Sequence, residues 1–311
     1  MIRDASKALE RIGLPGRDLY ELPTSEKRFP DGCNWRIEIS GVELPSTLRA
    51  VVEESDRTGL PVHRMIGTVM GSTLLSRTEL QEIAQLAADA KMEVILAPGP
   101  RATWDIGRQV ATPEGALSGV RLRGADQLAY AIADIKRSID LGFRGFLIVD
   151  EGLLWALTEM RKIGEIPRDI KFKVSIFAGH ANPAGAKVLQ FLGADTLNPV
   201  ADLSLPAISA IRKAVNIPID IHVCLFDSWG GFNRFYDCPE LARIAAPCYF
   251  KIEPGSSIAN SYRPWVSPDS LAFLAREKVK QAGIIRELVE KNYPEAKLSG
   301  RGPSDLAIPK P

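Results

Sequence analysis

Short apolar runs alternate along this chain with longer stretches in which apolar residues recur every three or four positions. The short runs predict buried strands, and the longer stretches predict amphipathic helices. Strands are predicted at residues 35–40, 62–70, 92–97, 145–149, 172–177, 196–200, 219–224 and 248–252. A helix is predicted after each strand, at residues 44–58, 79–91, 126–141, 153–163, 184–192, 205–215, 239–245 and 268 to about 291.

Local signals mark several of these helix ends. Ser76 is a candidate N-cap, and Glu79 three residues later completes a capping box. Glycines at 59, 142 and 193 follow predicted helix ends, where the chain needs a left-handed residue.

Eight strands separated by helices require crossover connections and therefore a parallel sheet. Eight such units in about 260 residues favour a closed (β/α)8 TIM barrel. The first strand is not followed by G-x-G-x-x-G, which argues against a dinucleotide-binding fold. We therefore expect an N-terminal extension at 1–31, a barrel at 32–294 and a C-terminal tail at 295–311. The tail is expected to contact a neighbouring copy, which favours a homo-oligomer.

Polar residues share one parity along the predicted strands, and that parity should face the barrel interior because the other faces the helices. The inward residues are Arg36, Glu38 and Ser40, Lys173 and Ser175, Asp220, His222 and Cys224, and Lys251 and Glu253. Asp150 and Asn198 stand at the C-terminal ends of their strands. Unpaired buried charges are very costly, so these groups must pair with each other, a metal or a ligand.

Two interpretations follow. In one, Lys173 and Lys251 neutralise Glu38 and Glu253 in a structural ion network. In the other, which we favour, the groups form a polar pocket at the C-terminal mouth, where active sites of such barrels lie. The candidate catalytic residues are Glu38, Asp150, His222, Lys251 and Glu253.

Glu38, Asp150, His222 and Glu253 are also a candidate ligand set for a divalent metal, because oxygen-rich ligation with one imidazole suits a hard or borderline ion. No HxH or HExxH spacing supports the set, so the cofactor stays unassigned. Lys251 has its own alternatives. A buried amine beside a carboxylate is typical of Schiff-base lyases, but a structural Lys–Glu pair has the same sequence pattern.

Long loops after the third, seventh and eighth strands should surround the mouth and bind the substrate. Their arginines and aromatic residues suit a small anionic ligand. The candidate substrate-binding residues are Arg101, His180, Asn198, Asp227 and Arg234.

Composition narrows the function classes. The chain has 39 Lys and Arg against 38 Asp and Glu, which argues against a nucleic-acid binder. Apolar runs are too short for a membrane span, and the N-terminus lacks a secretory apolar segment. Four scattered cysteines without a CxxC pair favour reduced thiols and a cytoplasmic protein.

The middle of the chain resembles the U32 peptidase family of collagenase-like barrels. Residues 149–154, Val-Asp-Glu-Gly-Leu-Leu, resemble its strand-to-helix segment. Asn182, Gly185-Ala186 and 192–195, Leu-Gly-Ala-Asp, resemble the Asn…Gly-Ala…Leu-Gly passage that follows. Leu203-Ser204-Leu205, leading to Ile211-Arg212, resembles the family's next helix, and Ile221-His222 with Ser228 and Gly230 resembles its Val-His-Gly…Ser-x-Ser-Gly block. The match covers roughly residues 140–235.

One departure concerns the cofactor. Cluster-binding U32 members have a cysteine four residues after the matching histidine, where this chain has Phe226. The spacing of Cys224 and Cys238 does not replace it, which argues against an iron–sulfur cluster. The resemblance implies a U32-like enzyme acting on a small anionic substrate or a peptide, with or without a divalent metal. A non-catalytic ligand-binding or assembly barrel and a Lys251-dependent lyase are the alternatives.

Overall fold

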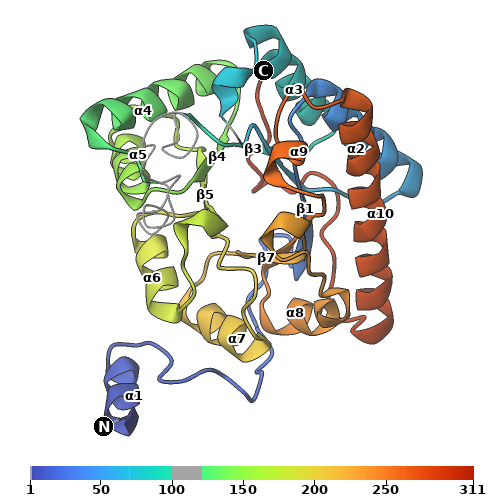
Figure 1. The fold of residues 1–311 in the computed structure, drawn as a ribbon. Coiled ribbons are helices and arrows are strands. Elements are labelled where there is room, and N and C mark those ends of the chain that lie inside the picture. Colours follow the sequence, from blue (N-terminus) through green and yellow to red (C-terminus); the bar gives the residue numbers. More distant parts are fainter. Residues whose placement is uncertain (1, 70, 100–120) are drawn as a thin grey trace.

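The computed structural model describes residues 2–69, 71–99 and 121–311. Parallel strands close into a barrel in chain order, and β8 pairs with β1. The strands are β1 (Trp35–Ser40), β2 (Arg64–Gly67), β3 (Glu93–Leu96), β4 (Gly145–Ile148), β5 (Lys171–Val174), β6 (Thr196–Leu197), β7 (Ile219–Leu225) and β8 (Cys248–Glu253). Helices surround the strands (Figure 1), so the expected (β/α)8 barrel is confirmed.

The helices are α1 (Ile2–Arg11), α2 (Pro45–Thr58), α3 (Arg77–Asp89), α4 (Gly124–Asp140), α5 (Glu151–Ile163), α6 (Pro183–Phe191), α7 (Leu205–Ala214), α8 (Cys238–Ile244), α9 (Ile258–Ser261) and α10 (Pro268–Asn292). The capping box of Ser76 and Glu79 opens α3 as expected. Helix α1, which the sequence pattern did not predict, lies apart from the barrel at the end of an extended segment (Figure 1). None of the helices in the described part of the chain has the length and apolar character needed to span a membrane.

Several strands are shorter than their apolar runs. The run at 172–177 ends as a strand at Val174, because Ser175 accepts a hydrogen bond from the Phe177 amide and caps a 3₁₀ turn, η4 (Ile176–Ala178). That turn directs Phe177 over the C-terminal end of the barrel. The apolar run at 62–70 forms a strand only over Arg64–Gly67.

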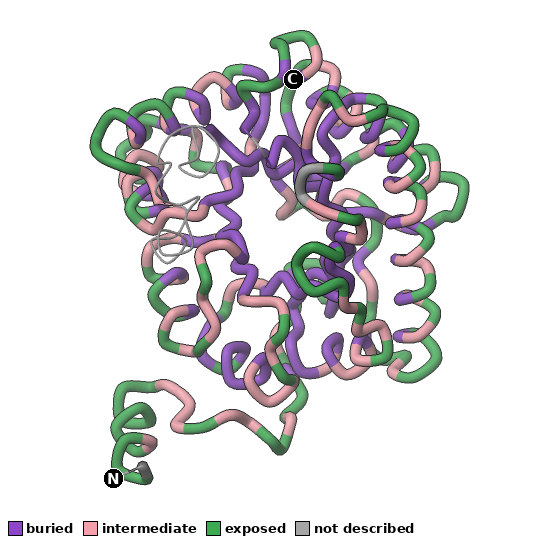
Figure 2. The backbone as a smooth tube through the Cα atoms, in the orientation of Figure 1, coloured by how far each residue is buried: buried purple, intermediate pink, exposed green. Residues whose placement is uncertain are grey.

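The two faces of each strand differ in chemistry as the alternation predicts. Ile37 and Ile39 belong to the apolar layer between the strands and the helices. Glu38, between them, is buried among charged side chains. Figure 2 shows buried backbone around the barrel wall and exposed backbone on the outer helices and the N-terminal segment.

The C-terminal tail covers the N-terminal end of its own barrel, and its contact with a neighbouring copy stays a prediction. Asp305 accepts two hydrogen bonds from Arg36, at 2.8 and 2.7 Å. The Ala307 amide donates to Glu93 Oε1 at 3.0 Å. The Ser299 amide donates to the Trp35 carbonyl, which joins the tail to the N-terminal end of β1.

His63 joins this tail to the barrel and should make stability depend on pH. Its Nδ1 accepts from the Ile37 amide at 3.1 Å, and its Nε2–H faces the Ser299 and Gly300 carbonyls at 3.0 and 3.1 Å. Burial lowers the pKa of His63 to about 4. The unfolded state therefore binds the proton more tightly, and stability is present above pH 6.5 and lost as pH falls toward 4.

We expect the free energy of unfolding to fall by about 2 kcal/mol more between pH 7 and pH 5 in the wild type than in His63→Asn. Urea unfolding at both pH values measures this difference, and the other titrating groups cancel in the comparison. Equal pH dependence of the two proteins would contradict a neutral buried His63.

Candidate functional site

The barrel interior contains a network of buried ions. Lys173 Nζ lies 2.5 Å from Asp220 Oδ2 and 3.0 Å from Glu38 Oε2. Arg64 contacts Glu93, Asp220 and Glu38 at 2.5, 2.9 and 3.2 Å. We call Glu38, Arg64, Glu93, Lys173 and Asp220 the interior ion network. Its side chains are at most 3% exposed, so their charges are compensated almost entirely by each other.

Strand register explains why these charges meet. Glu38 stands opposite Arg64 on β2 and opposite Lys251 on β8. Burial raises the pKa of the Glu38 carboxyl, but Lys173, Lys251 and Arg64 outweigh burial, and the net pKa is lowered. Glu38 is therefore ionised and ion-paired in the middle of the barrel.

A second group of charges lies nearer the C-terminal end. Lys251 Nζ is 3.5 Å from Glu253 Oε2 and 3.8 Å from Glu38 Oε1. Within the described residues these are its two charged contacts, both longer than a normal hydrogen bond to a carboxylate. His222 Nε2 is 2.6 Å from Glu253 Oε2. Three predicted catalytic residues thus come together at the mouth: His222, Lys251 and Glu253.

The surroundings assign the protonation states of this group. Burial and Lys251 lower the pKa of His222, so its imidazole is neutral near pH 7. Burial raises the pKa of Glu253, but Lys251 and His222 outweigh it and the net pKa is lowered. Nε2–H of His222 therefore donates to an ionised Glu253, and Nδ1 accepts from Asn198 Nδ2 at 3.3 Å. Asn198 also donates to the Asp220 carbonyl at 2.8 Å, which fixes its side chain next to His222.

Lys251 and Glu253 line a small cavity at the C-terminal mouth, together with side chains from the ends of β2, β5, β7 and β8. The cavity volume is about 20 Å³, which is room for about one water molecule. Phe177 and Trp229 stack over it with ring centroids 4.7 Å apart. We call this pair the aromatic cover. Trp229 is 37% exposed, so the cover separates the buried charges from solvent.

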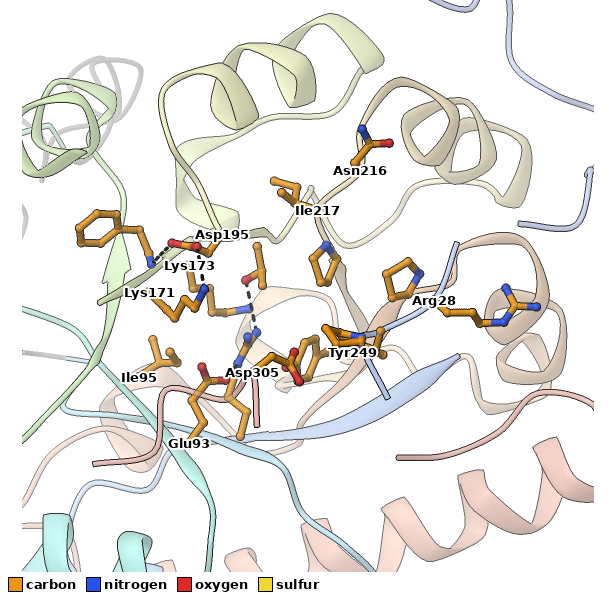
Figure 3. A pocket seen from close by; sticks show the side chains of 17 residues that line it. Arg28, Glu93, Ile95, Lys171, Lys173, Asp195, Asn216, Ile217, Tyr249 and Asp305 are labelled. Carbon is orange, nitrogen blue, oxygen red and sulfur yellow. Dashed lines mark hydrogen bonds and ion pairs between the residues drawn. The ribbon is translucent and has the colours of Figure 1, made fainter. Parts of the chain in front are cut away.

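A larger cavity, of about 380 Å³, lies at the opposite end of the barrel, among the N-terminal ends of the strands. Figure 3 shows its side chains, with Lys171 and Asp195 pointing toward each other at one edge. Lys171 Nζ is 3.3 Å from Asp195 Oδ1. Arg64, Lys173 and Glu93 line it as well, but they are partners within the interior ion network. The active sites of such barrels lie at the C-terminal end of the strands, opposite this cavity.

Two other predicted residues have local structural partners instead. Asp150 is the N-cap of α5: its Oδ1 accepts from the Leu153 amide and its Oδ2 from the Leu122 amide, both at 3.0 Å. His180 Nε2 lies 2.8 Å from Glu151 Oε1, on the first turn of α5.

The loop residues likewise have specific positions. Arg234 donates to the Leu203 carbonyl at 2.8 Å and pairs with Asp237, so its guanidinium joins two loops. Asp227 is exposed at the start of η5 (Asp227–Trp229), and its amide donates to the Gly255 carbonyl at 2.8 Å. Arg101 lies outside the described residues.

The four candidate metal ligands do not gather. The described part of the chain contains no group of three or more His, Cys, Asp or Glu side chains placed to hold a metal ion. The physical reason is that each carboxylate already has other partners: backbone amides for Asp150, and Lys173 and Arg64 for Glu38. His222 and Glu253 form a pair, not a quartet.

Sequence reasoning missed some buried groups. Arg64 and Glu93 point into the barrel, as Glu38 does. The residues that directly follow them, Met65 and Val94, point the other way and belong to the outer apolar layer. Lys278 interrupts the apolar stripe of α10 formed by Ala275, Ala282 and Ile285. A lysine within the apolar stripe of a helix predicts a buried ammonium, and this was the sequence signal for Lys278.

No protein-family profile matches the chain, and no curated protein matches it. Among solved structures, the U32 peptidase Mk0906 shares 20% identity, with 66% of this chain and 74% of that chain covered and a TM-score of 0.41. A D-psicose 3-epimerase from Clostridium cellulolyticum H10 shares 11% identity over 82% of this chain and 99% of that one, with a TM-score of 0.46. DHDPS from Cyanidioschyzon merolae shares 14% over 85% and 78%, also with a TM-score of 0.46. The barrel fold of this chain is shown by its own strand pairing.

Proposed function

We propose that this chain is an enzyme that performs acid–base chemistry on a small anionic molecule at the C-terminal mouth of its barrel. The main support is that Lys251 and Glu253, neighbouring inward residues of β8, both line the mouth cavity. Lys251 Nζ lies 3.5 Å from Glu253 Oε2. Cation and carboxylate in one covered cavity can bind an oxyanion and move a proton beside it.

The roles follow from the contacts. Lys251 donates to an anionic oxygen of the substrate, because its ammonium has no close hydrogen bond within the described residues. Glu253 accepts a proton through Oε1, while its Oε2 stays with His222. His222 positions Glu253, and Asn198 positions His222. The proton passes from a substrate C–H or O–H to the carboxylate and returns to substrate or water.

The size of the cavity favours a small substrate over a peptide. With about 20 Å³ of free space, entry requires Phe177 and Trp229 to separate. Membership of the U32 lineage is part of this proposal and rests on the sequence resemblance over residues 140–235. A homo-oligomer and a cytoplasmic location also remain predictions.

We expect the protein to exchange a C–H proton next to the carboxylate or carbonyl of a small acid for deuterium. Proton NMR in D2O with a panel of 2-oxo and 2-hydroxy acids measures this exchange. Glu253→Gln should slow it by about 100-fold or more, because the amide cannot accept the proton. The exposed Glu290→Gln serves as the control and should match the wild type. Exchange that is equally fast in Glu253→Gln would contradict the assignment of the base.

A non-catalytic binding or assembly barrel is the second candidate. The small mouth cavity and the mutual pairing of the interior ion network favour it. It predicts no Glu253-dependent exchange with any acid that binds.

The buried amine of Lys251 is also compatible with a third function, a Schiff-base lyase. Borohydride added with 2-oxo acids would then leave a covalent adduct on Lys251, detectable by mass spectrometry. The acid–base proposal predicts no such adduct.

A further inference from the structure

Three buried hydroxyl groups near the mouth have no hydrogen-bond partner among the described residues: Ser40 Oγ, Ser261 Oγ and Tyr262 Oη. Their residues are at most 3% exposed. Buried polar groups in folded proteins nearly always have partners, so a set of three without partners indicates that something else binds there. Water or a ligand are the two physical choices.

A buried ammonium lies in the same region. Lys278 projects from the apolar stripe of α10 and is 2% exposed. Its Nζ donates to the Ser40 carbonyl at 2.5 Å, and no described carboxylate lies within ion-pair distance. An ammonium can donate three hydrogen bonds, so this one has donors to spare. A buried cation without a close anion is costly.

Two glycines show how closely these groups approach one another. A Cβ at Gly41 would lie 2.7 Å from Lys278 Nζ, 3.3 Å from the Tyr262 ring and 3.4 Å from the Ser261 carbonyl. Gly41 also has a φ of +76°, which favours glycine. A Cβ at Gly255 would lie 2.6 Å from Ser261 Oγ. The chain just after β1 thus lies close to Lys278 Nζ, the Tyr262 ring and the Ser261 backbone, and the chain just after β8 lies close to the Ser261 hydroxyl.

The same place adjoins the mouth cavity. Tyr262 lines that cavity together with Lys251 and Glu253. Ser40 is the next inward residue of β1 after Glu38. The acids that face Lys278 are Glu253 and Glu43. Burial raises the pKa of Glu43 to about 8, so Glu43 is neutral near pH 7 and adds no negative charge there.

We propose that Lys278, with the hydroxyls of Tyr262, Ser261 and Ser40, forms an oxyanion subsite that holds a phosphate or carboxylate group of the mouth's substrate. This inference rests on the proposed function and adds to it the chemical class of the substrate's distal group. Hydroxyl donors and one ammonium complement an oxyanion, and within the described residues Lys278 has no carboxylate at ion-pair distance to satisfy its remaining donors.

The test is calorimetric titration of the full chain with inorganic phosphate and, separately, with acetate. We expect saturable binding of at least one; a preference for phosphate or for acetate identifies which group the subsite takes. Lys278→Met should weaken binding about 10-fold or more, and Tyr262→Phe about 3- to 10-fold. Tyr262→Phe removes a hydroxyl without a partner, so it should fold even if Lys278→Met does not. The exposed Lys280→Met and Tyr236→Phe are matched controls and should bind like the wild type.

Absence of saturable binding by either anion, or binding that Tyr262→Phe and Lys278→Met leave unchanged, would overturn the subsite. This readout is independent of turnover. Anion binding that depends on Lys278, without Glu253-dependent exchange, would keep the subsite and refute the proposed reaction. Glu253-dependent exchange whose KM is unchanged in Tyr262→Phe would refute the subsite and keep the reaction.

Discussion

Replacing Lys173 by methionine is expected to destabilise the protein by about 3–5 kcal/mol. The ammonium lies 2.5 Å from Asp220 and 3.0 Å from Glu38, and both carboxylates are fully buried. Methionine fills a similar volume, so the loss comes from leaving two buried carboxylates to Arg64 and, for Glu38, the more distant Lys251. Urea unfolding followed by circular dichroism gives the free energy of unfolding.

Lys171 provides the control for this prediction, because it lies two residues earlier on β5. Its side chain is 41% exposed and makes one ion pair, with Asp195. Lys171→Met should therefore change stability by less than about 1 kcal/mol. Adding Asp220→Asn to Lys173→Met should recover part of the loss, because it removes one of the uncompensated charges. A Lys173→Met protein as stable as Lys171→Met would contradict the interior ion network.

Lys251→Met is expected to have a different profile: a large loss of function with a smaller loss of stability than Lys173→Met. Its two ion pairs are long, at 3.5 and 3.8 Å. Without Lys251, Glu38 keeps Lys173 and Arg64, and Glu253 keeps His222. We expect kcat/KM in the exchange assay to fall by about 100-fold or more, because the substrate oxyanion loses its cation.

Comparing Lys251→Met with Lys173→Met distinguishes a lysine that binds substrate from one that stabilises the fold. The same urea experiment should find Lys251→Met less destabilised than Lys173→Met, because the ion pairs of Lys251, at 3.5 and 3.8 Å, are longer. Wild-type exchange by Lys251→Met would refute its proposed role. A stability loss as large as that of Lys173→Met would make Lys251 a member of the interior ion network.

Glu38 shows which features of the site the sequence predicts and which it does not. Strand parity placed it correctly inside the barrel with Lys173 and Lys251. Parity does not say which inward charges meet, because that depends on the register between strands distant in sequence. The register sets Glu38 opposite Arg64, whose inward position was not predicted. The contacts of Glu38 with Arg64 and Lys173 therefore could not be predicted from parity alone.

Asp150 shows a second limit of the same kind. An aspartate at the end of a strand can line a pocket or cap the following helix, and both have the same sequence pattern. The structure selects the cap, with the Leu153 and Leu122 amides as donors. The alternation of strands and helices was enough to predict the fold, whereas strand ends depended on caps such as Ser175.

We propose that ligands bind at the C-terminal mouth and not in the larger cavity at the N-terminal end. Protein labelled with ¹³C at lysine Cε can be titrated with an exchanging acid and followed by NMR, with Lys251→Met identifying the Lys251 signal. We predict a saturable shift of the Lys251 signal and none for Lys171, which lines the other cavity. A shift of the Lys171 signal with an unchanged Lys251 signal would place the ligand in the N-terminal cavity and refute binding at the mouth.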